Sequence, residues 1–208
     1  MIRPSVAGVA FGTAADGDPR IDDVARAAVS SSLGIASEWA WVRQVHGAVV
    51  VEPEGAGIGD EADALITMNP ALPIAVSVAD CLPVALICDG AVGIAHAGWR
   101  GAAGGVVGAT IAALVAGGHQ PHTAVIGPGI GPCCFEVGDE VADRFPGHRS
   151  RTSWDTVSVD LPGAVAADLA GLDVEMVGGC THHQDRFHSY RNDGTNHRQF
   201  GVAWIPLV

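Results

Sequence analysis

Three histidine and cysteine residues, whose side chains can bind transition metals, each lie where a predicted strand ends. They are His46 in "QVHG", Cys81 in "ADC" and His96 in "AHAG". A thiolate and two imidazoles suit zinc, and three protein ligands leave one position open for water or substrate. The structural alternative is a turn histidine, a small buried cysteine and a hydrogen-bonded core histidine. The spacing matches neither CxxC nor HExxH, so residue type alone leaves both interpretations open.

A hairpin predicted around Asp89-Gly90 favours the metal interpretation for two of these residues. Asp-Gly is a strong signal for a two-residue turn between antiparallel strands. Pairing outward from this turn places Cys81 opposite Gly98 and makes His96 its diagonal neighbour on the same face, ~7–8 Å away between α-carbons. A three-residue turn would shift the pairing and separate the two side chains. Pro83 would also allow a bulge in this strand.

Two charged residues flank the candidate site. Asp80 precedes Cys81, so on a regular strand it would point to the opposite face. We interpret it as a proton donor, as a partner that fixes a histidine tautomer, or as a strand-end cap. Arg100 in "GWRGAAGG" lies at a predicted helix start, where free N–H groups and small residues let an anion approach. It could clamp a phosphate or carboxylate, or pair with one of the many acidic side chains.

The other cysteines have weaker signals. Cys133 and Cys134 are adjacent in "IGPGIGPCCFEVG", and adjacent cysteines rarely form a mutual disulfide because the geometry is strained. We expect them to be packing residues, with a second metal or a redox role as the alternative. Cys180 ends a predicted strand before "THHQDRFHSYRNDG" and is a candidate pocket-lining residue. Arg191 in the same segment could bind a ligand or anchor its loop.

The composition excludes several function classes. The 208 residues include 23 acids and 11 arginines but no lysine, so the net charge is −12 and lysine-dependent catalysis is excluded. An acidic, lysine-free surface argues against nucleic acid and anionic membranes as partners. No apolar stretch approaches the ~20 residues of a membrane span. Five irregularly spaced cysteines and no signal-peptide pattern predict a cytoplasmic protein with reduced thiols. Nothing in the sequence indicates an obligate protein partner.

The elements that must position these residues alternate only partly between strand and helix. We expect a first strand over residues 5–11, a strand–turn–strand over 39–52, and a strand over 200–208 at or next to a sheet edge. Helices are expected over 21–34, ended by Gly34, over 100–118, and over 161–172 with Pro162 in the first turn. This pattern favours a mixed α/β (α+β) fold over a regular doubly wound sheet. We find no linker or repeat, so residues 1–208 are expected to form a single domain.

Five motifs resemble one known family in their order along the chain: "QVHG", "SVADCLPV", "HAGWRG", "IGPGIGPCCFEVG" and "CTHHQDRFHSYRNDG". The family is variously named laccase-domain protein, multicopper polyphenol oxidase and purine nucleoside phosphorylase, and the resemblance covers about residues 42–205. It implies a layered sandwich of mixed β-sheets flanked by helices. It also implies metal ligands at His46, Cys81 and His96.

The resemblance guides the choice of site residues. We place candidate catalytic groups at Asp80 and Cys81, and candidate substrate contacts at Gln44, Arg100, Cys180 and Arg191. The sequence departs from the family at a usual N-terminal arginine, absent from "AFGTAADGD", at Asn192 in place of a second arginine, and at His197 in place of a glycine. Two of these changes remove possible anion contacts.

The resemblance implies a zinc-dependent purine nucleoside enzyme. Its reactions would be phosphorolysis of adenosine, inosine and methylthioadenosine, and deamination of adenosine, with purine nucleoside and phosphate as partners. A zinc-bound hydroxide could attack C6 of adenine. Phosphorolysis would instead need phosphate held near the ribose, by Arg100 and the helix start, and a proton for the departing base, from Asp80.

Three alternatives stay open. The first is a copper-dependent polyphenol oxidase, since Cu²⁺ could occupy the same ligands. The chain nevertheless lacks the His-x-His pairs and several cupredoxin domains that a blue-copper oxidase needs. The second is a metal-free hydrolase with Cys81 as nucleophile and His96 as base, a class that would fit peptidoglycan precursors. The third is a non-enzymatic binding domain with a structural zinc, for which Cys180 or a loop histidine would supply a fourth ligand.

Overall fold

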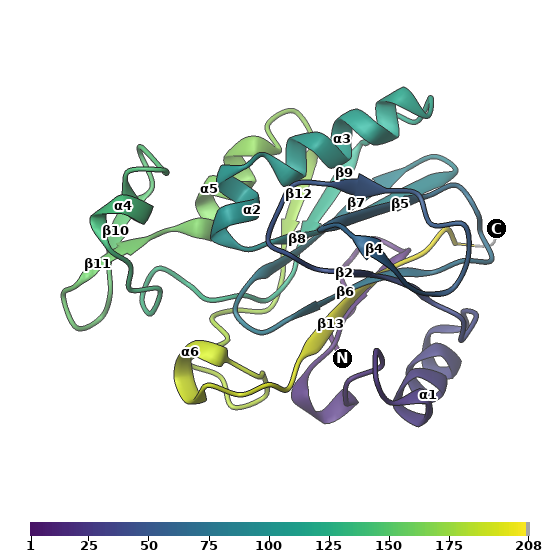
Figure 1. Ribbon diagram of the computed structural model, residues 1–208, viewed down its shortest axis with the longest axis horizontal. Helices are drawn as coiled ribbons and strands as arrows, with labels where there is room; N and C mark the ends of the chain where they lie inside the picture. The colour runs from purple at the N-terminus through teal and green to yellow at the C-terminus, as the bar shows by residue number, and fades with distance from the viewer. Residues whose placement is uncertain (207–208) are drawn as a thin grey trace.

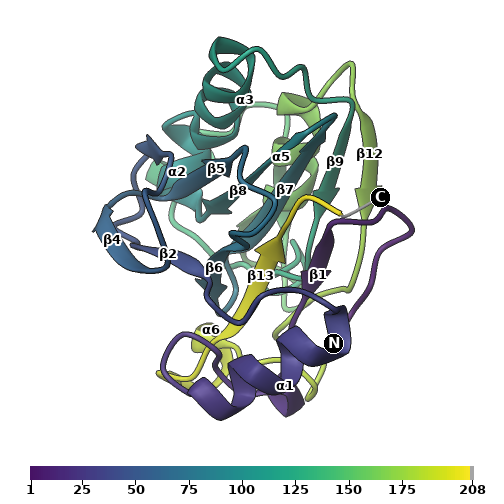
Figure 2. The ribbon, with the colours of Figure 1, turned by 90° about the vertical axis from the view of Figure 1, so that its right-hand side faces the viewer.

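A computed structural model describes residues 1–206 and shows two stacked β-sheets with helices on both outer faces (Figures 1 and 2). The first sheet has the order β1-β13-β6-β2-β4, formed by β1 (Val9–Phe11), β13 (Gln199–Ala203), β6 (Ile74–Val78), β2 (Ala40–Arg43) and β4 (Gly57–Glu61). The second has the order β12-β9-β7-β8-β5-β3, formed by β12 (Asp173–Met176), β9 (Thr123–Ile126), β7 (Leu82–Cys88), β8 (Ala91–Ala97), β5 (Ala64–Thr67) and β3 (Val50–Val51). Both sheets contain parallel and antiparallel pairs, so the expected layered sandwich of mixed sheets is confirmed.

Helices cover the two outer faces of the sandwich. On the first sheet α1 (Asp23–Leu33) packs where Trp39, Trp41 and Phe200 are buried, and Gly34 ends it in the left-handed conformation as predicted. The second sheet is covered by α2 (Trp99–Ala103), α3 (Val106–Ala116) and α5 (Leu161–Asp168). The short helices α4 (Asp139–Ala142) and α6 (Tyr190–Asp193) and the hairpin of β10 (Arg149–Arg151) and β11 (Val157–Val159) lie outside the sandwich (Figure 1). None of the helices within residues 1–206 has the length and apolar content needed to cross a membrane.

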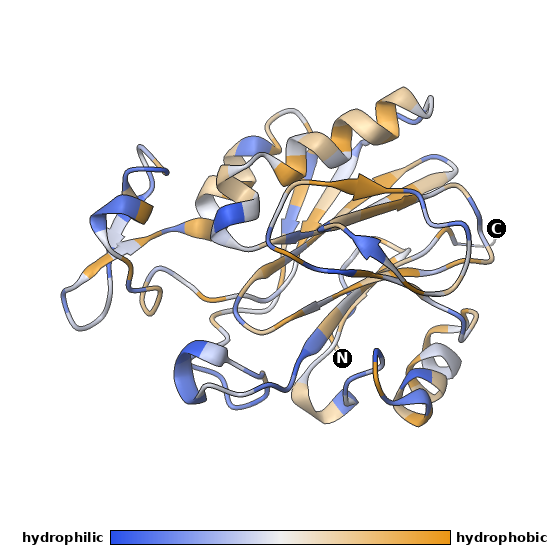
Figure 3. Ribbon diagram, in the orientation of Figure 1, coloured by the Kyte–Doolittle hydropathy of each residue, from blue (hydrophilic) through white to orange (hydrophobic). Residues whose placement is uncertain are grey.

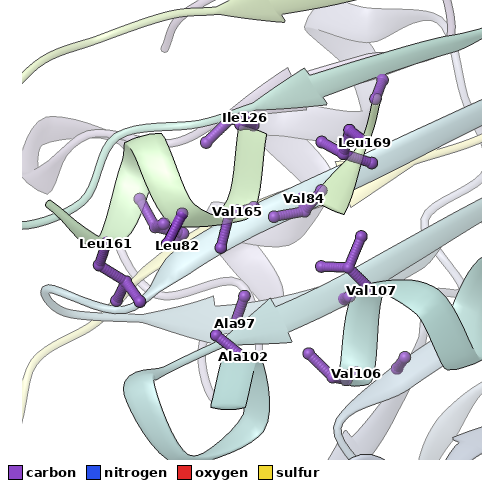
Figure 4. Packing of buried hydrophobic residues seen from close by; sticks show 14 of the residues in the cluster. Leu82, Val84, Ala97, Ala102, Val106, Val107, Ile126, Leu161, Val165 and Leu169 are labelled. Atoms are coloured by element: carbon purple, nitrogen blue, oxygen red, sulfur yellow. The ribbon is translucent and has the colours of Figure 1, made fainter. Parts of the chain in front are cut away.

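Alternation along β7 explains why this strand is buried on both faces. Leu82, Val84 and Leu86 pack toward α2, α3 and α5, and Figure 4 shows the first two beside Val165 and Ile126. The intervening residues pack against the first sheet. The central strands β7 and β8 are accordingly apolar along most of their length, whereas α6 and its flanking loops are hydrophilic (Figure 3). Cys81 immediately precedes β7 and is an even number of residues from Ala85 and Ile87, so it belongs to the same face. Its side chain packs at the edge of the apolar cluster between the two sheets.

The predicted hairpin is present with the predicted register. Asp89 and Gly90 form the turn, Cys88 pairs with Ala91, and His96 pairs with Pro83. The pairing continues without a bulge up to the first residue of β7, next to Cys81. The same register extended by one residue places Cys81 opposite Gly98, as the Asp-Gly turn indicates.

The structure differs from the sequence predictions in three places. The helix expected over 100–118 is two helices, because Gly104 and Gly105 interrupt it and Gly105 has a φ of 81°. The strand–turn–strand expected over 39–52 is present as β2 and β3 with a bend at His46-Gly47, but the two strands belong to different sheets. The first strand is shorter than expected, at Val9–Phe11. The last strand, β13, is next to the edge as expected, and residues 207–208 of that prediction lie outside the described residues.

Candidate functional site

The three predicted metal ligands come together at the edge between the two sheets. The donor atoms of His46, Cys81 and His96 lie within 4.8 Å of one another. The two imidazole rings meet edge to face with centroids 4.8 Å apart. His96 is 3% exposed, whereas His46 is exposed, so the group opens to solvent on one side. We call these three residues the first cluster.

A buried carboxylate that the sequence analysis did not single out orients both histidines. Asp63 is fully buried, and its Oδ1 lies 2.8 Å from His96 Nδ1. The same carboxylate accepts backbone N–H groups of Val45, His46 and Gly47 at 3.2, 2.9 and 2.6 Å. The contact to Nδ1 directs Nε2 of His96 toward the cluster, which is the usual way that a second-shell carboxylate fixes a ligand histidine. The only sequence feature that could have identified Asp63 is its position in "DEADAL", as an acid between two alanines at the start of β5.

Electrostatics favour a thiolate in the first cluster. Burial alone raises the pKa of Cys81, but the charge of His96 and hydrogen bonds from both histidines outweigh it and lower this pKa to about 6. Burial lowers the pKa of His96, and the opposing effects of Cys81 and Asp63 raise it to about 9. Burial likewise raises the pKa of Asp63, but its hydrogen bonds to His96 and the backbone hold it below the usual value. A metal ligand must be deprotonated, so Cys81 is prepared for that role at neutral pH.

The backbone is strained at two positions of the site. His46 has a φ of 62° and Asp80 a φ of 84°, conformations that residues other than glycine adopt rarely. At Gly98 the constraint is space, because a Cβ would lie 2.9 Å from the Cys81 sulfur and 3.1 Å from His46 Cδ2. The three backbone positions therefore hold the side chains of the first cluster in contact.

The first cluster lines a cavity of about 520 Å³ in which the chain's cations are concentrated. Five of the 11 arginines line it, namely Arg20, Arg43, Arg100, Arg191 and Arg198. Its apolar wall includes Val78, Trp99, Ile130 and Phe135. In a protein of net charge −12, cations gathered beside an apolar wall are an arrangement that suits an anion with an apolar group attached.

The predicted substrate contacts lie in different places. Gln44 lines the cavity, but its amide makes two 2.8 Å hydrogen bonds with the Ser77 backbone. Arg100 lines it with its guanidinium 4.2 Å from the centre of the Trp99 ring. Cys180 does not line this cavity and borders another one. Gln44 therefore braces the wall, and Arg100 faces the space.

Asp80 and Arg191 join the cavity to the C-terminal loop. Asp80 accepts the Thr181 hydroxyl at 2.6 Å and the Arg191 backbone N–H at 2.7 Å, one on each carboxylate oxygen. The Arg191 side chain donates to the Glu136 carbonyl and lies over Phe135, 5.3 Å from the ring centre. Both residues thus line the cavity and also anchor loops, while ligand binding by Arg191 and proton donation by Asp80 stay predictions.

Three of the cavity arginines were missed by sequence reasoning. Arg20 and Arg198 come from opposite ends of the chain, and Arg43 ends β2 before Gln44. None of them lies in a recognisable motif. Arg20 follows "AFGTAADGD", the stretch that lacks the family's usual arginine, so the structure supplies a cation from a neighbouring position.

Comparisons with known proteins give the family and support the fold. Residues 3–206 match the family described as multi-copper polyphenol oxidoreductase laccase. A Streptomyces griseus protein named purine nucleoside phosphorylase ORF3 is 40% identical, over 94% of this chain and 86% of its own length. A Deinococcus radiodurans protein named purine nucleoside phosphorylase is 36% identical, over 91% of this chain and 79% of its own. The crystal structure of YlmD from Geobacillus stearothermophilus superimposes with a TM-score of 0.80 and 27% identity, covering 98% of this chain and 94% of that one. With its ligand cluster, its sandwich fold and these relatives, the chain belongs to the multi-copper polyphenol oxidoreductase laccase family.

Proposed function

We propose that this chain catalyses the phosphorolysis of purine nucleosides in the cavity beside the first cluster. One observation carries the proposal: five arginines and an open three-ligand cluster share one cavity in an acidic protein. Phosphorolysis needs an anion and a nucleoside held together, and the cavity offers cations beside an apolar wall. The names of the relatives point to the same reaction.

The donor set fits a zinc ion. His46, Cys81 and His96 would hold it, and the missing Cβ of Gly98 leaves room for the sulfur and an imidazole to meet. When bound, the ion supplies Lewis acidity and lowers the pKa of a coordinated water. Asp63 would keep His96 in the tautomer that presents Nε2 to the cluster. Copper also binds thiolate and imidazole donors, so the donor types alone do not select zinc over copper. We choose zinc because three protein ligands with one open position are typical of catalytic zinc.

The arginines would position the phosphate. Arg100 is stacked on Trp99 and pairs with no carboxylate within residues 1–206, so its N–H groups can bind an oxyanion in bidentate fashion. A phosphate oxygen would attack C1′ of the ribose as the bond to the purine nitrogen breaks. The departing purine then carries the electron pair and needs a proton.

Asp80 is the predicted donor of that proton. Both of its carboxylate oxygens accept hydrogen bonds from the C-terminal loop, which also gives this residue a positioning role. The purine would lie against the apolar wall of the cavity, which includes Ile130 and Phe135.

Deamination of adenosine and turnover of methylthioadenosine are further activities that we propose for the same cavity. Deamination would use hydroxide delivered to C6 of adenine. Oxidation of phenols with copper bound, and hydrolysis by Cys81 and His96 without metal, stay alternative predictions. Each gives a different product, so one product analysis separates them.

The test is a product analysis with purified, zinc-loaded protein. Inosine and adenosine are incubated with and without phosphate, and products are identified by mass spectrometry. We expect free purine together with ribose 1-phosphate, formed only with phosphate. Base release that is equally fast without phosphate would replace phosphorolysis by hydrolysis, and oxygen uptake with a phenol in the copper-loaded protein would favour the oxidase.

Two cysteine variants provide the matched controls for this test. Cys81→Ala removes a ligand of the first cluster. Cys88→Ala removes a buried core cysteine that does not line the cavity and whose thiol donates to the His119 carbonyl, at 3.8 Å. The proposal expects the first variant to lose base release and the second to keep it.

A further inference from the structure

A second group of metal-binding side chains lies away from the first cluster. Its members are Cys133, Cys134, Cys180 and His183, and one donor atom from each lies within 4.8 Å of all the others. We call these four residues the second cluster. It shares no residue with the first cluster, and the cavity described above is lined by none of its members.

The donor atoms of the second cluster are close enough to surround one ion. The sulfurs of Cys133 and Cys134 are 3.4 Å apart, and they lie 3.7 Å from Nδ1 and 3.1 Å from Nε2 of His183, respectively. A zinc ion with sulfur ligands at ~2.3 Å separates those sulfurs by about 3.8 Å in a tetrahedron. One imidazole gives one nitrogen to one ion, so binding requires a rotation of the exposed His183 ring together with small rotations of the cysteine side chains.

Two loops are joined where this cluster lies. The first loop follows β9 and carries Cys133 and Cys134, and the second follows β12 and carries Cys180 and His183. Gly129 and Cys180 form a parallel bridge, and the Gly131 N–H points at the Cys180 sulfur at 3.2 Å. The backbone bridge thus places Cys180 beside the loop of the cysteine pair, and the Gly131 N–H orients its sulfur.

The surroundings suit a closed site. Cys134 is fully buried, Cys133 and Cys180 are half-buried, and His183 is exposed and covers the group from outside. None of the five cysteines forms a disulfide. Three thiols and one imidazole make a soft donor set of the Cys₃His type, which is typical of four-coordinate structural zinc.

We infer that Cys133, Cys134, Cys180 and His183 bind a structural zinc ion, separate from the ion of the first cluster. The four protein donors fill the coordination sphere, so this ion has no open position for substrate. It cross-links the loop that supplies Ile130 and Phe135 to the cavity with the loop that Thr181 ties to Asp80. Its role is to hold two walls of the cavity together.

The experiment uses the Cys81→Ala protein, because this variant removes the first metal site and leaves the second intact. After dialysis against a weak chelator, zinc per chain is measured by mass spectrometry. We expect about one zinc in Cys81→Ala, about one in Cys180→Ala, and none in the double variant. The Cys88→Ala control should keep the wild-type content of about two.

A second measurement applies even if Cys180→Ala fails to fold. In folded Cys81→Ala protein, alkylation of Cys133, Cys134 and Cys180 is mapped by peptide mass before and after a strong chelator. Bound zinc protects the thiols, so chelation should increase their alkylation several-fold while Cys88 is unchanged. Cobalt added to the same protein should give a thiolate charge-transfer band in the near ultraviolet.

Two results would overturn the inference. One is a Cys81→Ala protein that contains no zinc, gives no cobalt band and shows the same alkylation with and without chelator. The other is a mass two hydrogens lower than that of the free thiols, with a disulfide located between two members of the second cluster. Neither result depends on whether the protein is a nucleoside phosphorylase.

Discussion

The two cysteine–histidine clusters differ in the elements that carry them and in what surrounds them. In the first cluster Cys81 and His96 lie at the ends of β7 and β8, and His46 lies in the loop after β2. A buried carboxylate, Asp63, contacts the His96 ring and the His46 backbone and so positions the two histidines. The second cluster lies on two loops and has four donors. The first opens onto an arginine-lined cavity, whereas the second is covered by its own histidine. A rigid frame with an open position suits chemistry, and a filled sphere on loops suits cross-linking.

The largest expected effect comes from removing the thiolate of the first cluster. Cys81→Ala should lose the zinc of the first cluster, keep that of the second, and reduce base release by at least about 100-fold, because two imidazoles alone hold zinc weakly. The fold should be kept, since Cys81 lies at the edge of the sandwich. Metal analysis, circular dichroism and the nucleoside assay check this. Full activity in Cys81→Ala protein whose first cluster is empty would break the proposed division of roles between the clusters.

Asp63→Asn should weaken the first cluster and leave the second unchanged. The amide cannot replace a carboxylate that accepts three backbone N–H groups and the His96 ring. We expect a loss of about 10–100-fold in zinc affinity, as for other second-shell carboxylates. Competition with a chromogenic chelator measures it. A positioning role also predicts partial recovery of activity at high zinc, which general destabilisation would not give.

Arg100→Ala should affect phosphate and neither metal ion. A hydrogen bond to a charged group contributes ~1.5–3 kcal/mol, so KM for phosphate should rise by about 10–100-fold with zinc content unchanged. Arg151→Ala is the matched control, because Arg151 is exposed and pairs with Asp155 outside the cavity. An unchanged phosphate KM in Arg100→Ala would move the anion site toward Arg191.

Gly98→Ala tests whether the contact between Cys81 and His46 is sterically tight. The new Cβ would lie 2.9 Å from the Cys81 sulfur, so the ligands must separate and zinc affinity should fall about tenfold, equivalent to ~1.4 kcal/mol. Gly108→Ala in α3 is the control, because nothing lies within 4 Å of its added Cβ. Equal zinc affinity in both variants would show that the first cluster is less constrained than its geometry indicates.

The smallest effect concerns thiol reactivity in the metal-free protein. His96 and His46 lower the pKa of Cys81 to about 6 against the effect of burial, whereas burial raises the pKa values of Cys133 and Cys134. At pH 7 Cys81 is therefore mostly thiolate, and the other two remain thiols. Iodoacetamide should alkylate Cys81 with a midpoint near pH 6 and the pair only at alkaline pH. Similar midpoints for all three would remove this difference between the clusters.

The parts of the molecule that could be predicted have local signals. The register of β7 and β8 follows from the Asp89-Gly90 turn, and with it the proximity of Cys81 and His96. Gly34 as a helix end is equally local. The family resemblance supplied the layered sandwich and implied the same three ligands that residue type and strand-end position had indicated, His46 among them. These are features that a few neighbouring residues, or an ordered set of motifs, can specify.

The remaining features depend on contacts between distant segments. Asp63 and His96 are 33 residues apart, and Cys134 and His183 are 49 apart, so no periodic pattern connects either pair. Arg20 and Arg198 enter the cavity from the two ends of the chain. The sequence analysis continued one helix through Gly104-Gly105 because apolar residues continue beyond it, whereas Gly105 has a left-handed φ of 81° and begins a new helix.

The β7–β8 hairpin has a consequence for how the first cluster assembles. Cys81 and His96 are joined by one short hairpin, an element that closes within ~1–10 μs in isolated form. His46 lies between β2 and β3, which belong to different sheets, so its approach needs contacts of much longer range. Two of the three ligands should therefore be close together early in folding, and the third should arrive only when the sheets stack. Zinc uptake during refolding would then follow the closure of the sandwich rather than the formation of the hairpin.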